Sequence, residues 1–480
     1  MIKLREILSP FLILGLLSAC STPTPQATPP LSIPAQWQTS RPPNNALATA
    51  NQAGKLSLWW QQQTDPFLAS LIESAQLASP SVAQAFSRIA AAKLELTAAW
   101  SARFPSFDAT AGATRTHNVP GIGPTTTLQA GLQTAWELDL WHEKRDANSA
   151  ASLQLAGSQA QWHDARTLVA AEVANVYFEH ATCRQLRELA QADANSWHET
   201  AKISQLSAQH GMLAHALAAQ TRASAAQASI RLIEQATQCE HSLKALVALT
   251  GIEEGALKTQ LDQALAQAVL ARPVAVAALP AQMLRQRPDI FAAERNVTAA
   301  SLQIGVAEAK QYPSLSLNGS IGILRQGSNG RQSTLHSWSI GPVTLNYPFL
   351  DGGQRQANIQ LAKAQYQEAV IGYTSRVRLA VKEVEQALLN LQGADMRQAE
   401  ADLVSQSYAQ TLAATQAKQS QGLANLLELE EARRLALTAQ TTQLSLQLER
   451  NRAWVALYRA LGGGWDASAT DTAPFTPNHS

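Results

Sequence analysis

The chain has 480 residues and a formal net charge of +1, and only 15% of its residues are charged. This balance lacks the basic surplus that nucleic-acid binding requires, and no run of like charges indicates a surface for anionic lipid. Hydrophobic residues make up 46% of the chain but aromatic residues only 6%, because much of the apolar content is alanine. Alanine-rich helices pack closely and bury little area each, which favours coiled coils over a large globular core.

The N-terminus is typical of a secretion signal. The apolar stretch 7–17 follows two basic residues and is shorter than the roughly 20 residues that a membrane-spanning helix needs. The sequence Leu-Ser-Ala-Cys that ends at Cys20 resembles a bacterial lipobox, in which the cysteine thiolate accepts a lipid. We therefore expect a signal peptide over 1–19 and lipidation at Cys20; an ordinary signal peptide with a chance cysteine is the alternative. By the same resemblance to bacterial lipoproteins, the serine that follows Cys20 favours the outer membrane over retention at the inner one.

Proline, serine and threonine dominate the residues after Cys20. No packed core can form from such a composition, so residues 20–54 are expected to form an extended tether between the lipid anchor and the folded body. The small polar residues 465–480 are expected to form a disordered tail.

Two long segments predict two antiparallel helical hairpins. Proline is absent from 143–209 and from 354–421, and both segments greatly exceed the usual 8–20 residues of a globular helix. The second segment carries an apolar residue at every seventh position, which is the pattern of a coiled-coil seam: Val370, Val377, Val384 and Leu391. A glycine then separates each segment from another helical stretch. The hairpins are expected at 143–250, around Gly211, and at 353–462, around Gly422.

Four segments alternate apolar and polar residues as strands do: 105–117, 127–140, 314–323 and 335–349. In the last one the alternation changes phase at Gly341-Pro342, which predicts a bulge. Lengths of 10–14 residues with one apolar face match transmembrane strands, although two hairpins of a soluble sandwich remain the alternative. Aromatic residues near the strand ends are expected at the membrane interface: Trp136, Trp141, Trp338 and Tyr347.

The chain repeats itself at an offset of about 210 residues. The aromatic-Pro-Ser element at 104–106 returns at 312–314, and Pro80 returns as Pro288. We expect a first repeat over 55–251, with a β-hairpin at 104–140, and a second over 287–464, with a β-hairpin at 312–350. Residues 252–286 would connect them. Four strands cannot close a barrel, and unpaired strand edges are not tolerated in lipid, so several copies must share one barrel.

Motifs in this order and at this spacing resemble the outer-membrane factors, the TolC-like trimeric efflux ducts, and most nearly their lipid-anchored, NodT-like branch. The matching stretches follow: the lipobox, Arg287-Pro288-Asp289-Ile290, Tyr312-Pro313-Ser314-Leu315, Trp136-Glu137-Leu138-Asp139-Leu140 and the run Pro348–Arg355.

The resemblance implies a mainly helical fold with a small membrane β part. A homotrimer would form an α-barrel continuous with a 12-stranded outer-membrane β-barrel to which each chain gives four strands. The trimer would be lipid-anchored in the outer membrane of a Gram-negative bacterium and would extend into the periplasm. The expected function is the exit duct of a tripartite efflux or secretion system that passes small molecules, such as drugs or organic acids, from an inner-membrane pump and a periplasmic adaptor. Two alternatives are a periplasmic adaptor and a structural coiled-coil lipoprotein.

The resemblance also assigns the ends of the two helical hairpins to gating and adaptor docking. The residues concerned are Gly211, Lys418, Gly422, Leu423 and Asn425, and Lys418-x-x-x-Gly422 resembles the family's basic docking pattern. Some relatives have an aspartate after the second glycine, but this chain has none, which favours a constriction of Leu423 and Asn425. The alternative is that each glycine only ends its helix in a left-handed conformation.

The two cysteines beyond Cys20 are spaced symmetrically about the first hairpin end. Their midpoint is (183 + 239)/2 = 211, so Cys183 and Cys239 would lie at the same height on facing helices. In the oxidising periplasm we expect a disulfide, with two unrelated buried thiols as the alternative.

No motif indicates catalysis, a metal or a cofactor. The histidines lack metal-ligand spacing, and the glycine clusters lack the Lys-Ser/Thr that phosphate binding needs. We therefore expect no enzymatic activity and no bound cofactor.

Overall fold

The computed structural model describes residues 66–117, 124–267, 284, 287–328 and 331–465. The expected signal peptide, Cys20, the tether and the tail lie outside the described residues. The described elements are α4 (Pro66–Ala78), α5 (Pro80–Ser101), β1 (Ser106–Thr116), β2 (Thr125–Leu138), α6 (Glu143–Gln209), α7 (His215–Thr250), α8 (Glu254–Gln267), α9 (Pro288–Ala309), β3 (Ser314–Ser328), β4 (Arg331–Asn346), α10 (Gln354–Ser420) and α11 (Leu426–Ala460).

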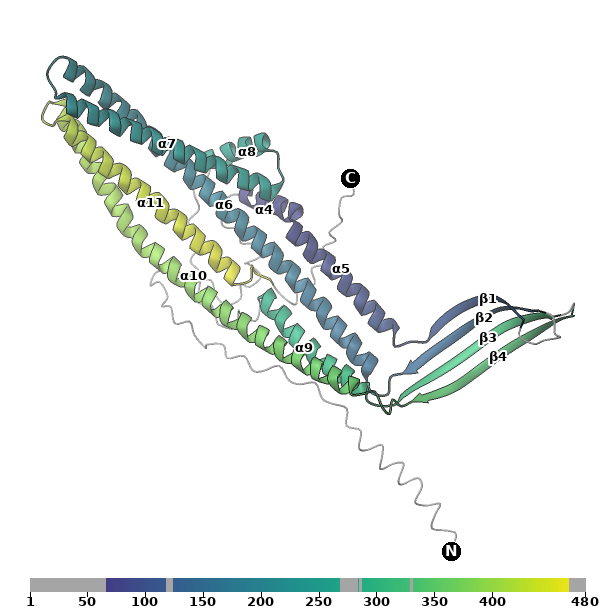
Figure 1. The fold of residues 1–480 in the computed structure, drawn as a ribbon. Helices are drawn as coiled ribbons and strands as arrows, with labels where there is room; N and C mark the ends of the chain where they lie inside the picture. Colours follow the sequence, from purple (N-terminus) through teal and green to yellow (C-terminus); the bar gives the residue numbers. More distant parts are fainter. Residues whose placement is uncertain (1–65, 118–123, 268–283, 285–286, 329–330, 466–480) are drawn as a thin grey trace, which may run out of the picture. The chain divides into compact units, whose positions relative to one another are not determined.

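The chain is mainly helical with one small sheet, as the sequence predicted. Helices α6 and α10 have 67 residues each, which at 1.5 Å rise per residue gives a length of about 100 Å. Figure 1 shows α7 returning along α6 and α11 returning along α10, so the chain forms two antiparallel helical hairpins. We call α6–α7 the first hairpin and α10–α11 the second hairpin. No helix among the described residues is long and apolar enough to cross a membrane.

The four strands form one antiparallel sheet in the order β1-β2-β3-β4. The expected bulge is confirmed, because Ile340 lies opposite Gly319 whereas Val343 lies opposite Leu317, so Gly341 and Pro342 share a single partner position. Three expected boundaries are wrong by three residues or more, one of them the end of β4, which lies at Asn346 and not at residue 349. Strand β3 continues to Ser328, five residues past the predicted end, and β4 begins at Arg331, four residues before the predicted start.

The repeat is visible in the start of two equivalent helices. Helices α5 and α9 both begin at the repeated proline and both have 22 residues. Proline suits the first helical position, where its missing N–H has no intrahelical partner. The compact units of the structure do not follow the repeats, since one unit joins Ser87–Gln159 to Ala292–Ser375, and the other contains the described parts of 32–86, 160–291 and 376–480. Each unit therefore draws on both halves of the chain.

The second unit has a core made by several helices. Buried side chains from six helices meet there: Leu71 of α4, Val82 of α5, Val173 of α6, Leu246 of α7, Leu257 of α8 and Trp454 of α11. Burying large apolar side chains contributes about 1.5–3 kcal/mol each, which fixes the base of the first hairpin against α4 and α8.

Candidate functional site

The two hairpin ends have the same backbone. In the first hairpin the Gly211 N–H donates to the Ala208 carbonyl at 3.1 Å, and the Met212 N–H donates to the Ser207 carbonyl at 2.9 Å. In the second hairpin Gly422 and Leu423 donate in the same way, at 3.0 and 2.9 Å. These are the two bonds of a Schellman motif, whose glycine is left-handed.

Backbone conformation, and not space, explains the glycines at these ends. The φ angles are 72° at Gly211 and 73° at Gly422. A Cβ added at either position would meet nothing within 4 Å. Both glycines thus end their helices, while the residue after each, Met212 or Leu423, leaves an exposed apolar side chain at the turn.

The residues predicted at the second hairpin end come together there, in identifiable local roles. The Lys418 carbonyl accepts the hydrogen bond from the Leu423 N–H, and the Lys418 side chain is exposed in the last turn of α10. Asn425 caps α11: its side-chain oxygen accepts the Glu428 N–H at 2.9 Å, and its amide donates to the Glu428 carboxylate at 2.8 Å. This reciprocal arrangement is close to a capping box. Leu423 is 73% exposed.

A buried carboxylate lies between the two hairpins near their ends, and the sequence analysis missed it. Glu430 of α11 is 4% exposed and accepts a hydrogen bond from the Thr200 hydroxyl of α6 at 2.7 Å. Its charge is paired with Arg433, whose guanidinium lies 2.6 Å away and also contacts Ser196 of α6. The pair therefore ties the second hairpin to α6. Glutamate is seldom buried unless it is paired, so composition alone gives no signal for it.

Cys183 and Cys239 form a disulfide that joins α6 to α7, and their Cα atoms lie 5.5 Å apart. A second contact between the same helices lies nearby. His180 Nδ1 and the Ser242 hydroxyl are 2.9 Å apart, and both side chains are buried. Burial, together with the charge of Arg184, lowers the pKa of His180 below its ordinary value, so the ring is neutral at neutral pH. Covalent and polar ties thus fix the first hairpin at one height.

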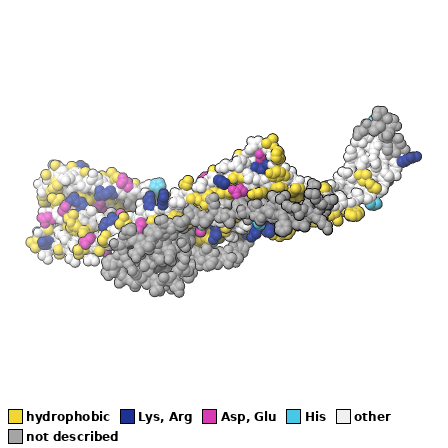
Figure 2. All heavy atoms as spheres, turned by 90° about the horizontal axis from the view of Figure 1, so that it is seen from below, with side chains coloured by type: hydrophobic (Ala, Val, Ile, Leu, Met, Phe, Trp, Pro, Cys, Tyr) yellow, Lys and Arg dark blue, Asp and Glu magenta, His cyan; other side chains and the backbone are white. Residues whose placement is uncertain are grey.

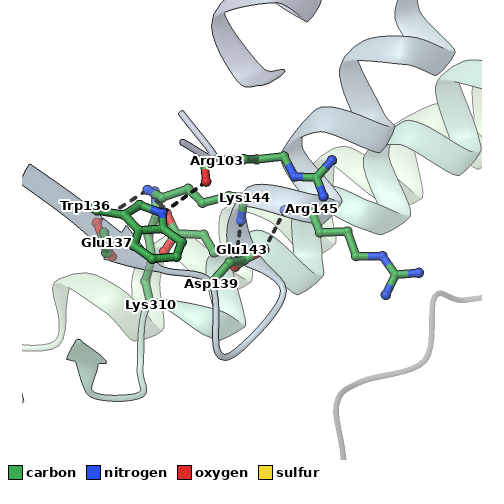
Figure 3. A network of polar contacts seen from close by, with 8 residues as sticks. All are labelled: Arg103, Trp136, Glu137, Asp139, Glu143, Lys144, Arg145 and Lys310. Carbon is green, nitrogen blue, oxygen red and sulfur yellow. Dashed lines mark hydrogen bonds and ion pairs between the residues drawn. The ribbon is translucent and has the colours of Figure 1, made fainter. Parts of the chain in front are cut away.

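The start of α6 is held to the sheet by charged groups (Figure 3). Asp139 accepts the Lys144 and Arg145 N–H groups at 3.0 and 2.9 Å, which satisfies two free donors of the first turn. The Lys144 ammonium lies between the carboxylates of Glu137 and Glu143, at 3.6 and 3.5 Å.

The aromatic residues predicted at strand ends occupy different places. Trp136 donates its indole N–H to the Arg103 carbonyl at 3.1 Å, at the helix end of the sheet (Figure 3). Trp141 donates to the Pro313 carbonyl at 2.7 Å and stacks on Tyr312. Tyr347 follows the end of β4 and is 57% exposed. Trp338, in contrast, lies near the middle of β4 opposite Ile321, because β4 begins earlier than predicted.

One face of the sheet is apolar and exposed. The large apolar side chains with high exposure include Leu132 at 52%, Ile321 at 60%, Trp338 at 75% and Ile340 at 84%. Leu132, Ile321 and Trp338 are neighbours across the three strands β2, β3 and β4, so they point to the same side. An exposed apolar surface that continues across several strands is typical of a contact with a membrane or another protein.

Within the described ranges, no group of three or more His, Cys, Asp or Glu could hold a metal ion. Hydrogen bonds, charge pairs and the disulfide found here connect helices and strands to one another.

The comparison with protein families matches this chain to the outer membrane efflux protein family over residues 71–252 and 279–463. The chain is 30% identical over 479 residues to the solvent efflux pump outer membrane protein SrpC of Pseudomonas putida, covering 96% of this chain and 98% of that protein. It is 29% identical over 465 residues to nodulation protein T of Rhizobium leguminosarum bv. viciae, covering 94% and 92%. Among solved structures, the outer-membrane channel OprN matches with a TM-score of 0.74 and 25% identity, covering 89% of this chain and 99% of that one.

Proposed function

The chain belongs to the outer membrane efflux protein family, and from this premise we propose that it is the outer-membrane exit duct of a tripartite export system. Three copies would form the duct, an inner-membrane pump would drive transport, and a periplasmic adaptor would connect pump and duct. The duct itself would carry out no chemical reaction.

The observation that carries this proposal is the sheet with one exposed apolar face and two free edges. Among the described residues, the strand order leaves β1 and β4 without a partner on their outer sides. Unpaired backbone groups are not tolerated in lipid, so β4 of one copy would pair with β1 of the next. Three copies of four strands give 3 × 4 = 12, which is an even number within the range of outer-membrane barrels.

The ends of the two hairpins are the proposed docking and gating region. Met212 and Leu423 are exposed at matching positions of the two turns, at 74% and 73%. Exposed apolar side chains on two rigid turns suit docking to a partner helix pair, with Lys418 as a basic contact beside them. The same turns would narrow the periplasmic entrance, with Leu423 contributing an apolar constriction. Asn425 would act there through its cap, which fixes the start of α11.

Lipidation at Cys20 would anchor the trimer to the outer membrane. This cysteine lies outside the described residues, so the support comes from the lipobox resemblance alone. The names of relatives point to different roles, solvent efflux in one case and nodulation in another. The proposal therefore extends to small molecules as a class.

The test combines assembly, conductance and export. The purified full-length chain is expected to run as a trimer and to open pores in planar bilayers. Deletion of the gene is expected to sensitise cells to at least one compound in a panel of solvents, dyes and antibiotics. A protein that neither trimerises nor conducts would contradict the proposal.

Docking is tested separately with an exposed residue. Leu423→Asp should keep the trimer, because the side chain is 73% exposed, but should abolish export. Normal export by this variant would contradict the docking role of the second turn.

Lipidation is tested with Cys20→Ser, which should no longer be labelled by a lipid precursor. Undiminished labelling of this variant would contradict the proposed lipid anchor.

A further inference from the structure

The apolar face of the sheet carries two arginines at its turn end, where each β-hairpin reverses. Arg325 of β3 lies opposite Leu128 of β2, and Arg115 of β1 lies opposite Thr126. Neighbours across a sheet point to the same face, and so do residues two apart on one strand. Ile323 precedes Arg325 by two residues, so both arginines share the face of the exposed leucines and isoleucines.

Carboxylates are missing from this part of the sequence. No Asp or Glu occurs between residues 109 and 136 or between residues 314 and 350. On the side seen in Figure 2, the sheet shows basic and apolar side chains and no acidic one. Arg115 and Arg325 are both exposed. One guanidinium N–H of Arg325 donates to Gln332, which leaves the other donors of the five available to a ligand.

A shallow hollow lies beside these arginines on the same face. Its volume is about 690 Å³, and its lining includes the small side chains Ala109, Ala111 and Ala130 next to the larger Ile321 and Ile323. Ala111, Ala130 and Ile323 lie in one row across the sheet. Arg325 lies in the next row toward the turns, about 7 Å farther along the strands. An apolar chain in this hollow would therefore have a charged end group within reach of the guanidinium groups.

The height of the arginines agrees with a headgroup position. Trp136 lies on β2 at the helix end of the face. Leu128 is eight residues before Trp136 on the same strand and lies opposite Arg325. At about 3.4 Å per residue and a strand tilt of about 35–45°, Arg325 lies roughly 20 Å from Trp136 along the membrane normal, and Arg115, one row farther, roughly 26 Å. The apolar band of an outer-membrane barrel is about 25 Å tall.

We propose that Arg115 and Arg325 bind the phosphate groups of a phosphorylated glycolipid in the outer leaflet, with one acyl chain in the adjacent hollow. This inference rests on the proposed outer-membrane placement, which puts the strand turns on the outer side. A phosphomonoester carries nearly two negative charges and three acceptor oxygens, so it can engage two arginines, each through paired N–H donors. A phosphodiester lipid carries less charge and fewer free oxygens, which favours the glycolipid.

The chain offers a matched control in Arg331. This residue lies at the same end of the sheet, opposite Ser328, but the following residue Gln332 shares the apolar face, so Arg331 points to the other side. The experiment compares the purified full-length wild type, the double variant Arg115→Gln/Arg325→Gln, and Arg331→Gln. Each is titrated with lipopolysaccharide, with dephosphorylated lipopolysaccharide and with phosphatidylglycerol, and binding is followed by the thermal shift of the trimer.

We expect equal binding of lipopolysaccharide by the wild type and Arg331→Gln, and about 30-fold weaker binding by the double variant, because two surface arginines are lost. Dephosphorylated lipopolysaccharide should bind the wild type as weakly as the intact lipid binds the double variant.

The inference is overturned if the double variant binds lipopolysaccharide like the wild type, if Arg331→Gln weakens binding as much as the double variant does, or if phosphatidylglycerol binds the wild type as tightly as lipopolysaccharide. Conductance of the wild type is recorded in parallel: its absence would refute the exit-duct function, whereas normal conductance with unchanged lipid binding refutes only the glycolipid site.

Discussion

The two helical hairpins share their turn but are held together by different chemistry. Cys183 and Cys239 lie 28 residues before and 28 residues after Gly211, and a disulfide joins them. At the corresponding height of the second hairpin, 27 residues before and 28 after Gly422, Asp395 Oδ1 and Arg450 Nε lie 2.5 Å apart. A covalent bond in one repeat thus corresponds to an ion pair in the other.

This difference has a mechanical consequence. A disulfide holds α6 and α7 at a fixed distance, whereas an ion pair whose side chains are 29% and 34% exposed can exchange with water. The second hairpin is instead tied to α6 near its end, through the buried Glu430–Arg433 pair. A duct that opens at its periplasmic entrance would therefore keep the first hairpin rigid and move the second, and this movement would have to break the contact between Glu430 and Thr200.

The largest effect is expected from removal of the disulfide. Cys183→Ser with Cys239→Ser should lower the local stability of the first hairpin by about 2–4 kcal/mol, because the bond closes a loop with a sequence separation of 56. Hydrogen exchange along α6 and α7 measures this local opening. The second hairpin serves as the internal control and should exchange at the wild-type rate. Equal acceleration in both hairpins, or none in the first, would contradict the comparison.

The converse exchange should make the second hairpin resemble the first. Asp395→Cys with Arg450→Cys places two thiols at the height where the other repeat has its disulfide. Oxidation should slow hydrogen exchange in α10 and α11, by a gain in local stability similar to the roughly 2–4 kcal/mol that the first hairpin loses without its disulfide. Export should fall under oxidising conditions and recover on reduction if the second hairpin must move. Full export with a verified new disulfide would contradict the expectation that α10 and α11 must separate at this height for export.

The next largest effect is expected at Glu430. Glu430→Ala leaves Arg433 without its carboxylate and the Thr200 hydroxyl without its acceptor. Because Arg433 is partly exposed and keeps its contact with Ser196, the cost should be about 2 kcal/mol. Exchange should rise in α11 and in the facing part of α6. The neighbouring variant Glu431→Ala is the matched control, since Glu431 pairs with Arg434 at the same spacing but both side chains are exposed. Its effect should stay below about 0.5 kcal/mol.

The positions of proline and glycine in the sequence predicted the hairpins well but could not reveal the contacts between them. The long proline-free segments end where their glycines permit a left-handed turn, so Gly211 and Gly422 located both ends, and equal spacing about Gly211 predicted the cysteine pair. The burial of Glu430 depends on how the second hairpin packs on α6, which a heptad pattern within one hairpin does not determine. Strand register is equally hidden, which is why Arg115 and Arg325 could not be assigned to one face.

A smaller effect is expected from the caps that begin the returning helices. Asn425 caps α11 through its side chain, whereas Ala214 at the equivalent position before α7 makes no side-chain hydrogen bond. Asn425→Ala should destabilise the first turn of α11 by about 1 kcal/mol, and Ala214→Asn should stabilise α7 by a similar amount. Exchange of the first-turn amides measures both. An unchanged rate in both variants would mean that tertiary contacts, and not the cap, fix these turns.

The smallest effect at neutral pH, and the one that grows with acidity, is expected from His180. Its folded-state pKa lies below its unfolded value of about 6.5, because burial disfavours the charged ring. As pH falls through that value the unfolded state takes up a proton that the folded state does not, so the stability of the first hairpin falls until the folded ring also becomes protonated.

His180→Gln should keep a polar partner for Ser242 and weaken this pH dependence of exchange between pH 8 and 5. His241→Gln, an exposed position on α7, should leave the wild-type profile unchanged. The second hairpin contains no histidine between 354 and 460, so a similar loss of protection there over the same range would assign the effect to other groups.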